Sequence, residues 1–255
     1  DNTLILFLAD NGGCAEGMGR REGIQYKDKD PDQLKPMTKG ELQPDMIPKR
    51  TRDGRVLKQG TGVMTGGPDT YHGYGLAWAN ASNTPFREYK HWVHEGGISS
   101  PLIAHWPSGI GKKRHGKLES QPGHLIDLMA TCVDLGQATY PEKVGDTAIV
   151  PMQGTSLAPA FNGKKIGRKK PIYWEHEGNR AMRDGKWKLV WSVKGPWELY
   201  DMDADRTEMH DLSSKEPERL RNMIGGWESW AKSVGVSFPE PINYYKAYKQ
   251  SQGNQ

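Results

Sequence analysis

Residues 4–13 have the sequence LILFLADNGG, in which an apolar run ends abruptly in an acidic residue, an amide and a pair of glycines. A short apolar run that ends at glycine is typical of a buried strand in a parallel sheet. Open α/β sheets bind their ligands at the carboxyl ends of such strands. We therefore expect Asp10 and Asn11 to lie in a crevice at the edge of a sheet.

The side-chain oxygens of Asp10 and Asn11 are the kind of ligand that a hard cation such as Ca²⁺ or Mg²⁺ prefers. Residues 10–13 are equally typical of a plain turn, because asparagine and glycine tolerate positive φ angles. Spacing alone leaves both interpretations open.

The composition sets broad limits on the class of protein. A chain of 255 residues is long enough to bury a sizeable core in one or two domains. The net charge of +4 is modest, and no dense basic run is interleaved with aromatic residues, so nucleic acid is not an expected partner. No apolar run approaches the roughly 18 residues that a membrane span needs.

The segment 16–74 has little apolar periodicity and is rich in glycine, lysine, aspartate and proline. Loops of this length are uncommon in compact domains unless they are functional. We expect an insertion at the rim of the active site that shapes the choice of substrate.

Two elements are expected in the middle of the chain. Residues 101–106 predict a short strand, and apolar residues at three- and four-residue spacing predict a helix over 122–136 with Gly136 as its C-cap. The apolar face consists of Leu125, Leu128, Met129, Cys132 and Val133. We expect this face, including the Cys132 thiol, to be buried.

The pattern changes after residue 170 to that of an antiparallel sheet. The expected elements are a strand at 172–176, a hairpin at 180–191 around Asp184-Gly185, a strand at 197–201 and a helix from Pro217 onward. One face of this helix carries Leu220, Met223, Ile224, Trp227, Trp230, Ala231 and Val234. A small sheet covered by one helix follows from this pattern.

A second diagnostic segment, 84–107, has the sequence TPFREYKHWVHEGGISSPLIAHWP. Residues 2–13 resemble the second metal-binding strand of the sulfatases, in the alkaline-phosphatase-like superfamily, and residues 84–107 resemble the lysine-bearing segment that follows it. The resemblance covers nearly the whole chain. It implies an α/β fold, with 1–165 as the second half of a sulfatase-type catalytic domain and 166–255 as an antiparallel subdomain with a covering helix.

The resemblance also implies roles for single residues. Asp10 and Asn11 match metal ligands, for Ca²⁺ or alternatively Mg²⁺. Lys90 matches a lysine that contacts the sulfate group and the leaving oxygen. Glu95 matches a glutamate that we expect to be structural or to orient Lys90.

Three histidines are further candidates for the site: His91 and His94 lie next to Lys90 in the sequence, and His176 lies in the C-terminal subdomain. A histidine beside the site could donate a proton to the leaving group. The catalytic histidines of the family precede the metal-binding strand, so we expect His91 and His94 to be wall or structural residues. His176, in a loop of the C-terminal subdomain, either lines the substrate or satisfies a hydrogen bond within its loop.

Sulfatases make a formylglycine nucleophile from the first residue of a Cys/Ser-x-Pro-x-Arg motif. Cys14 is followed by AEGM and Cys132 by VDLG, so neither cysteine fits. The paired aspartates that complete the metal site in the family are not found before Asp10 either. The chain therefore resembles the C-terminal part of a longer sulfatase, and we expect the missing N-terminal part to supply the formylglycine.

The implied reaction is hydrolysis of a sulfate ester by that formylglycine, with a sulfated small molecule or sulfated carbohydrate as substrate. The family suggests a periplasmic or secreted location. Two alternatives stay open: a phosphate mono- or diester hydrolase of the same superfamily, and a catalytically inactive structural or carbohydrate-binding fragment. The second alternative arises because two side-chain ligands are too few for the usual coordination of Ca²⁺. We expect the isolated chain to lack turnover. We also expect it to expose half a sheet.

Overall fold

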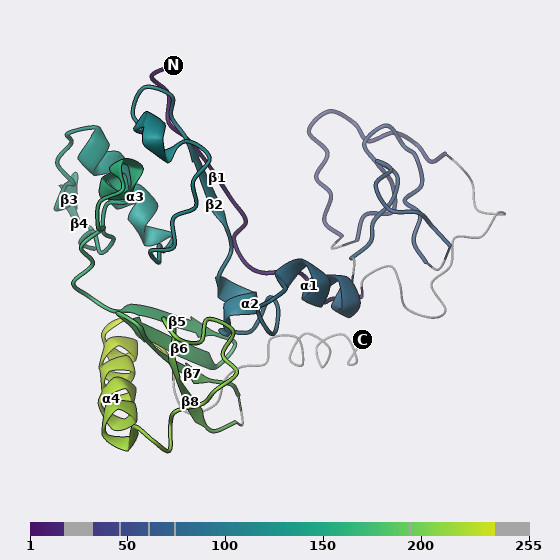
Figure 1. The fold of residues 1–255 in the computed structure, drawn as a ribbon. Helices are drawn as coiled ribbons and strands as arrows, with labels where there is room; N and C mark the ends of the chain where they lie inside the picture. The colour runs from purple at the N-terminus through teal and green to yellow at the C-terminus, as the bar shows by residue number, and fades with distance from the viewer. Residues whose placement is uncertain (18–32, 46, 61, 74, 194, 238–255) are drawn as a thin grey trace.

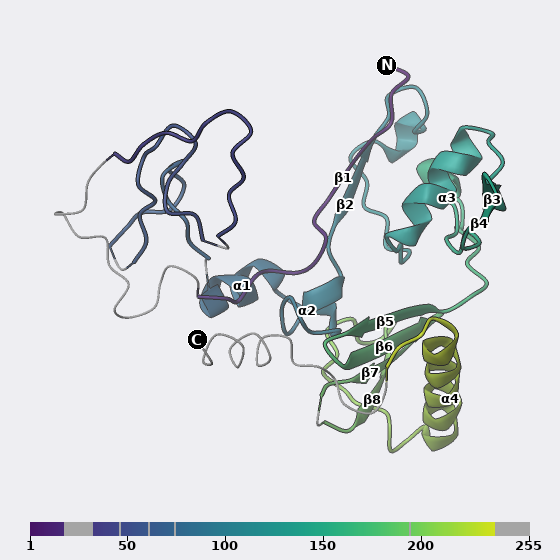
Figure 2. The same ribbon diagram turned by 180° about the vertical axis from the view of Figure 1, so that it is seen from behind.

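A computed structural model describes residues 1–17, 33–45, 47–60, 62–73, 75–193 and 195–237 of the chain. Its main features are a long two-stranded ribbon, a helical region beside it, and a four-stranded sheet with one helix along its side (Figures 1 and 2). None of the helices in these ranges has the length and hydropathy that crossing a bilayer requires.

The ribbon consists of β1 (Ile5–Leu8) and β2 (Leu102–His105). Both predicted strands are confirmed, but the parallel and buried arrangement expected for β1 is wrong. The strands pair antiparallel, and Phe7 is 69% exposed. A continuous apolar run is typical of a strand covered on both faces. In the described part of the chain no third strand pairs with the ribbon, so its apolar side chains stay open to solvent.

The long loop expected after β1 has neither helix nor strand in its described parts, 33–45, 47–60 and 62–73. Isolated bridges hold it together, among them one between Arg50 and Val56. Residues 18–32, 46, 61 and 74 of the predicted insertion lie outside the described residues. The chain then forms α1 (Gly75–Asn83) and the single turn α2 (Glu95–Ile98), which precedes β2.

The predicted middle helix is α3 (Ile126–Leu135), and Gly136 is its C-cap as expected. The expected buried face is wrong, because Met129 is more than half exposed and Cys132 is an exposed, free thiol. The face toward the protein instead carries Asp127 and Thr131, which accept hydrogen bonds from the backbone of residues 155 and 157. The short elements around α3 are η1 (Lys112–Arg114), β3 (Lys143–Val144), β4 (Thr147–Ala148) and η2 (Ala158–Asn162).

The C-terminal sheet confirms its prediction closely. Its strands follow the chain order and all pair antiparallel. They are β5 (Ile172–His176), β6 (Asn179–Asp184), β7 (Trp187–Trp191) and β8 (Trp197–Asp201). Gly185 makes the predicted hairpin turn with a φ of 57°, in the left-handed region that favours glycine.

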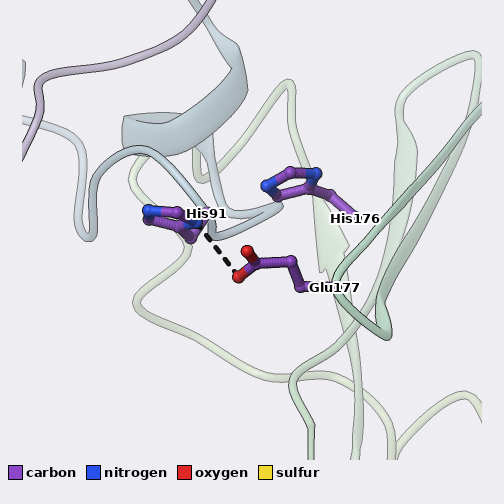
Figure 3. A group of neighbouring side chains, drawn as sticks. All are labelled: His91, His176 and Glu177. Atoms are coloured by element: carbon purple, nitrogen blue, oxygen red, sulfur yellow. Dashed lines mark ion pairs between the residues drawn. The ribbon is translucent and has the colours of Figure 1, made fainter. Parts of the chain in front are cut away.

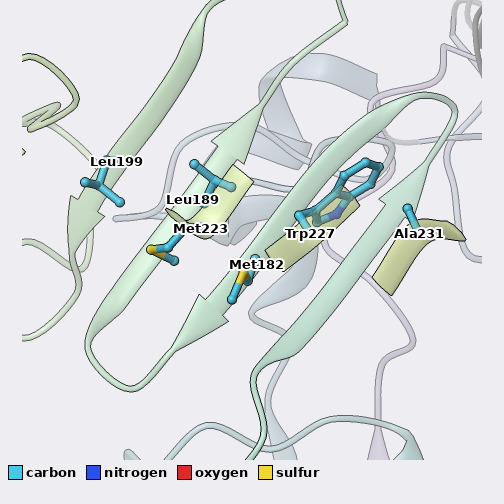
Figure 4. Close-up of a cluster of buried hydrophobic side chains, with 6 residues drawn as sticks. All are labelled: Met182, Leu189, Leu199, Met223, Trp227 and Ala231. Carbon is cyan, nitrogen blue, oxygen red and sulfur yellow. The ribbon is translucent and has the colours of Figure 1, made fainter. Parts of the chain in front are cut away.

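Helix α4 (Pro217–Ser233) covers one face of this sheet (Figures 1 and 4). The core between them consists of Met182, Leu189 and Leu199 from the strands and Met223, Trp227 and Ala231 from the helix. Alternate residues of the same strands point to the other face, where Ala181, Val190 and Tyr200 pack with Val93. The segment that carries Lys90 therefore rests on the back of the sheet. The domain boundary at 165/166 stays a prediction.

Candidate functional site

The turn after β1 is hydrogen-bonded to the segment around Lys90. The backbone N–H of Lys90 donates to the carbonyl of Gly13 at 3.0 Å, and that of Gly12 donates to Gly97 at 2.9 Å. A Cβ atom at Gly12 would lie 1.7 Å from the carbonyl oxygen of Gly96, so only glycine allows this approach. Two segments far apart in the sequence are thereby joined where both resemble metal- and sulfate-binding motifs.

Asp10 and Asn11 lie at the end of β1, along a wide groove that Lys90 and His176 also line. The amide nitrogen of Asn11 donates to the carbonyl of Gly12 at 2.8 Å, which leaves its side-chain oxygen as the remaining acceptor. A carboxylate and an amide oxygen fit a hard cation in kind, although such an ion takes about six to eight oxygen ligands in all. The role of these two residues as metal ligands stays a prediction.

Lys90 makes an ion pair with Glu16, with 3.2 Å between Nζ and Oε2. Partial burial lowers the pKa of Lys90, but the hydrogen bond and charge of Glu16 outweigh it, so the pKa is raised. The pKa of Glu16 is lowered to about 2, first by a hydrogen bond from the Cys14 thiol and then, against partial burial, by His91 and Lys90. Lys90 is therefore a fixed cation at neutral pH with an ionised carboxylate beside it.

His91 lies between two carboxylates, those of Glu16 and Glu177, and Figure 3 shows the one of Glu177. Its Nε2 atom is 3.2 Å from Oε1 of Glu16, and its Nδ1 atom is 3.0 Å from Oε2 of Glu177. Its ring stacks on that of His176, with 5.6 Å between the ring centroids. The loop of the C-terminal sheet thus approaches the Lys90 segment, as the sequence indicates for His176.

His94 and Glu95 do not contact Lys90 in the structure. His94 is 1% exposed, and its Nε2 atom lies 3.0 Å from Oε2 of Glu198 on β8. The carboxylate of Glu95 lies 2.7 Å from Nζ of Lys188 on β7. Glu95 therefore contacts Lys188, whereas the carboxylate that contacts Lys90 is that of Glu16.

Lys188 is the centre of a buried charged cluster that the sequence does not indicate. Its ammonium group is fully buried and lies 2.7 Å from carboxylate oxygens of both Glu95 and Glu208. Glu208 also accepts a hydrogen bond from the backbone N–H of Glu95 at 2.8 Å. Burial alone would raise the pKa of Glu95, but Lys188 lowers it below its ordinary value. This cluster fixes α2, and hence the segment after Lys90, against the sheet.

Glu16 and Lys188 are the contacts that sequence reasoning missed. Glu16 is the first residue of the segment that we expected to be a substrate-shaping loop. Lys188 lies in β7, a strand in which polar and apolar residues alternate in part. Neither carries a local signal, because each acquires its partners only when distant segments meet.

Comparison with known proteins identifies relatives for this arrangement. Residues 87–224, more than half of the chain, match the family model for the C-terminal region of N-sulphoglucosamine sulphohydrolase. An uncharacterized sulfatase of Schizosaccharomyces pombe is 24% identical over 92% of this chain and 39% of its own length. The N-acetylgalactosamine-6-sulfatase of Canis lupus familiaris is 30% identical over 49% of this chain and 22% of its own length. The chain thus spans less than half the length of these curated relatives.

A solved structure shares the fold. The crystal structure of Ps i-CgsB is 29% identical with a TM-score of 0.51, and the match covers 62% of this chain and 34% of that protein. The same protein has been solved in complex with k-i-k-neocarrahexaose, with the same similarity to this chain.

Proposed function

Because the chain belongs to the family of the N-sulphoglucosamine sulphohydrolase C-terminal region, and so to the sulfatases, we propose that it takes part in hydrolysing a sulfate ester to an alcohol and sulfate. The observation that best supports this proposal is the hydrogen bond between Lys90 and Gly13. It sets a cationic side chain beside the turn that carries Asp10 and Asn11. A sulfate group is stabilised by cations, and this arrangement sets a lysine next to oxygen atoms that could hold a metal ion.

The chemistry follows from the charge that develops on the substrate. Breaking the S–O bond leaves negative charge on the sulfate oxygens and on the leaving oxygen, and fixed cations in a partly buried site stabilise it. In this proposal the Lys90 ammonium donates hydrogen bonds to those oxygens. Asp10 and Asn11 would hold Ca²⁺, or Mg²⁺ in its place, which when bound neutralises charge on the sulfate. In this proposal the nucleophile would be a hydrated formylglycine, and neither Cys14 nor Cys132 stands in the motif that forms one.

We propose a sulfated carbohydrate as the substrate class. One relative is named for its action on N-acetylgalactosamine 6-sulfate, and the similar structure Ps i-CgsB has been solved with k-i-k-neocarrahexaose. The groove beside Lys90 is wide, and its lining includes Trp106, whose flat side chain suits contact with a sugar ring. These observations support an extended polar substrate over a small one.

The test uses the complete gene product that contains this chain. Sulfate release from sulfated galactose or hexosamine oligosaccharides is measured beside hydrolysis of 4-nitrophenyl sulfate and 4-nitrophenyl phosphate. We expect the sulfate esters to be hydrolysed, and Lys90→Ala to lower kcat/KM by about 10²–10³-fold, the range for removing one fixed charge-stabilising group. Lys143→Ala, which removes an exposed lysine of β3, is the matched control and should leave activity unchanged.

Two outcomes would contradict the proposal. Faster hydrolysis of the phosphate ester than of every sulfate ester would move the assignment to phosphoryl transfer. Full activity in Lys90→Ala would remove Lys90 from the reaction, even if the sulfatase activity itself were present.

A further inference from the structure

A compact group of nitrogen and oxygen ligands lies next to Glu16, the residue that pairs with Lys90. Figure 3 shows the three side chains of this group. His91, His176 and Glu177 each offer one ligand atom, and these atoms lie within 4.8 Å of one another. Two imidazoles and one carboxylate are the ligand set of open zinc sites, in which water occupies the fourth position. This set differs in kind from the oxygen-only pair at Asp10 and Asn11, which suits a hard cation.

The two ring nitrogens of His91 have different surroundings. Its Nδ1 atom is shielded from solvent and lies 3.0 Å from Oε2 of Glu177, yet it makes no hydrogen bond of acceptable geometry there. Its Nε2 atom lies 3.2 Å from Oε1 of Glu16. A metal-binding histidine usually presents one nitrogen to the ion while a carboxylate orients the other. His91 has this arrangement, with Nδ1 on the side of the ligand group and Glu16 behind the ring.

The backbone that carries these three residues is held in place before any ion binds. His91 and Glu177 have φ angles of 84° and 51°, in the left-handed region that non-glycine residues rarely adopt and that is enriched at functional sites. The Asn179 side chain donates to the carbonyl of His91 at 2.9 Å, and Glu175 accepts a hydrogen bond from Gly178 at 2.8 Å. The turn between β5 and β6 is thereby tied to the Lys90 segment.

We propose that His91, His176 and Glu177 bind a borderline transition-metal ion of the Zn²⁺ class, at a site separate from Asp10 and Asn11. Ligand atoms around a tetrahedral zinc ion are about 3.4 Å apart, so the side chains must draw in from their present limit of 4.8 Å. The exposed His176 has the freedom to make that movement by side-chain rotation. The site bridges the Lys90 segment and the C-terminal sheet, so the ion would join them.

Metal binding to the full 255-residue chain tests this proposal without any measurement of activity. The protein is stripped with a chelator and titrated with Co²⁺ as a spectroscopic probe, and with Zn²⁺ in competition with a chromophoric chelator. We expect one Zn²⁺ per chain and a visible Co²⁺ spectrum of tetrahedral type. His176→Ala and Glu177→Gln should each weaken Zn²⁺ binding at least 10-fold, and Glu16→Gln by about 10–100-fold, the range for the residue behind a metal ligand.

His105→Ala, which removes an exposed histidine of β2, is the matched control and should bind Zn²⁺ as the unmodified chain does. Circular dichroism of each variant separates loss of the site from loss of the fold. Absence of stoichiometric Zn²⁺ binding, or unchanged affinity and Co²⁺ spectrum in folded His176→Ala and Glu177→Gln, would overturn the proposal. Either of those results would leave the sulfatase assignment untouched, because it does not depend on this ion.

Discussion

Glu16 links the polar groups around Lys90. Its carboxylate lies 3.2 Å from the Lys90 ammonium group and 3.2 Å from the His91 ring, and it accepts a hydrogen bond from the Cys14 thiol. The side chains of Glu16 and Lys90 are 39% and 29% exposed, so solvent screens the pair and its contribution is no more than about 1 kcal/mol. In the proposed reaction an entering sulfate group can therefore replace Glu16 at Lys90 at modest cost.

The lowered pKa of Glu16 predicts a pH-dependent contribution to stability. The pKa falls from its ordinary 4.5 to about 2 in the folded chain, so the ionised form is favoured by folding. Its contribution is complete above pH 4.5 and is lost as the pH falls toward 2. We expect Glu16→Gln to lower the free energy of unfolding by about 1 kcal/mol at pH 7, and by progressively less below pH 4.5.

Urea denaturation at several pH values between 7 and 2.5 measures this difference. Glu142→Gln is the control, because Glu142 is an exposed glutamate that follows α3 in the chain. A Glu16→Gln deficit that stays constant down to pH 2.5 would show that the carboxylate does not stabilise the fold through its charge.

At the scale of elements, Lys188 joins β7 to α2. Its ammonium group is fully buried between Glu95 and Glu208. We expect Lys188→Met to lower the free energy of unfolding by about 3–5 kcal/mol, because it removes the ion-pair partner that two buried carboxylates share. Lys186→Met is the matched control on the same hairpin. The side chain of Lys186 is 47% exposed and pairs with Asp201, so its loss should cost no more than about 1 kcal/mol.

Urea denaturation at pH 7 compares the two lysine variants. Hydrogen exchange of the α2 amides adds a local readout, which should speed up in Lys188→Met alone. Equal costs for the two substitutions would mean that the buried cluster contributes nothing beyond an exposed ion pair.

The contact of α4 with the sheet gives a second prediction at this scale. Trp227 is fully buried, and its Nε1 atom donates to the carbonyl of Trp174 at 3.0 Å. We expect Trp227→Ala to lower the free energy of unfolding by about 3–5 kcal/mol, since it removes a large core side chain and leaves a cavity. Trp78→Ala removes the same side chain from an exposed position on α1 and should change stability little. Thermal unfolding followed by near-ultraviolet circular dichroism compares the two, and similar shifts in Tm would contradict this account of the core.

The elements that the sequence predicted well are those whose patterns are completed by near neighbours in the chain. Apolar residues alternate along strands β5 to β8 and recur at helical spacing along α4, and each of these elements packs on a near neighbour in the chain. Helix α3 has the right period but the wrong buried face. Asp127 and Thr131 are drawn inward by hydrogen bonds from the backbone of residues 155 and 157, which hydropathy does not register.

The site divides in the same way. Asp10, Asn11 and Lys90 could be singled out because each lies within a recognisable local motif, and the structure places all three along one groove, while their roles stay predictions. The partner of Lys90 could not, because Glu16 reaches it through the path of the chain after β1 and has no motif of its own. The buried ion pairs of Lys188 depend likewise on segments that meet only in the folded chain.

At the scale of the whole molecule, the β1–β2 ribbon presents an open apolar face. The pairs Ile5↔His105 and Phe7↔Ile103 lie on one side of the ribbon, and all three apolar members are more than half exposed. Exposed apolar surface and unpaired strand edges are where chains associate. The expectation that the chain exposes part of a sheet is thereby confirmed for this ribbon, although the arrangement of its strands is not the one expected.

We therefore predict that the chain self-associates through this ribbon and that two lysines on its face weaken the association. Sedimentation velocity over a range of concentrations should show larger species for the unmodified chain, and a shift toward monomer for Phe7→Lys combined with Ile103→Lys. The same change in charge at Met64 and Leu118, which are exposed elsewhere, is the control and should leave association unchanged. If both double variants dissociate equally, net charge and not the ribbon governs association, since only one of them alters the apolar face.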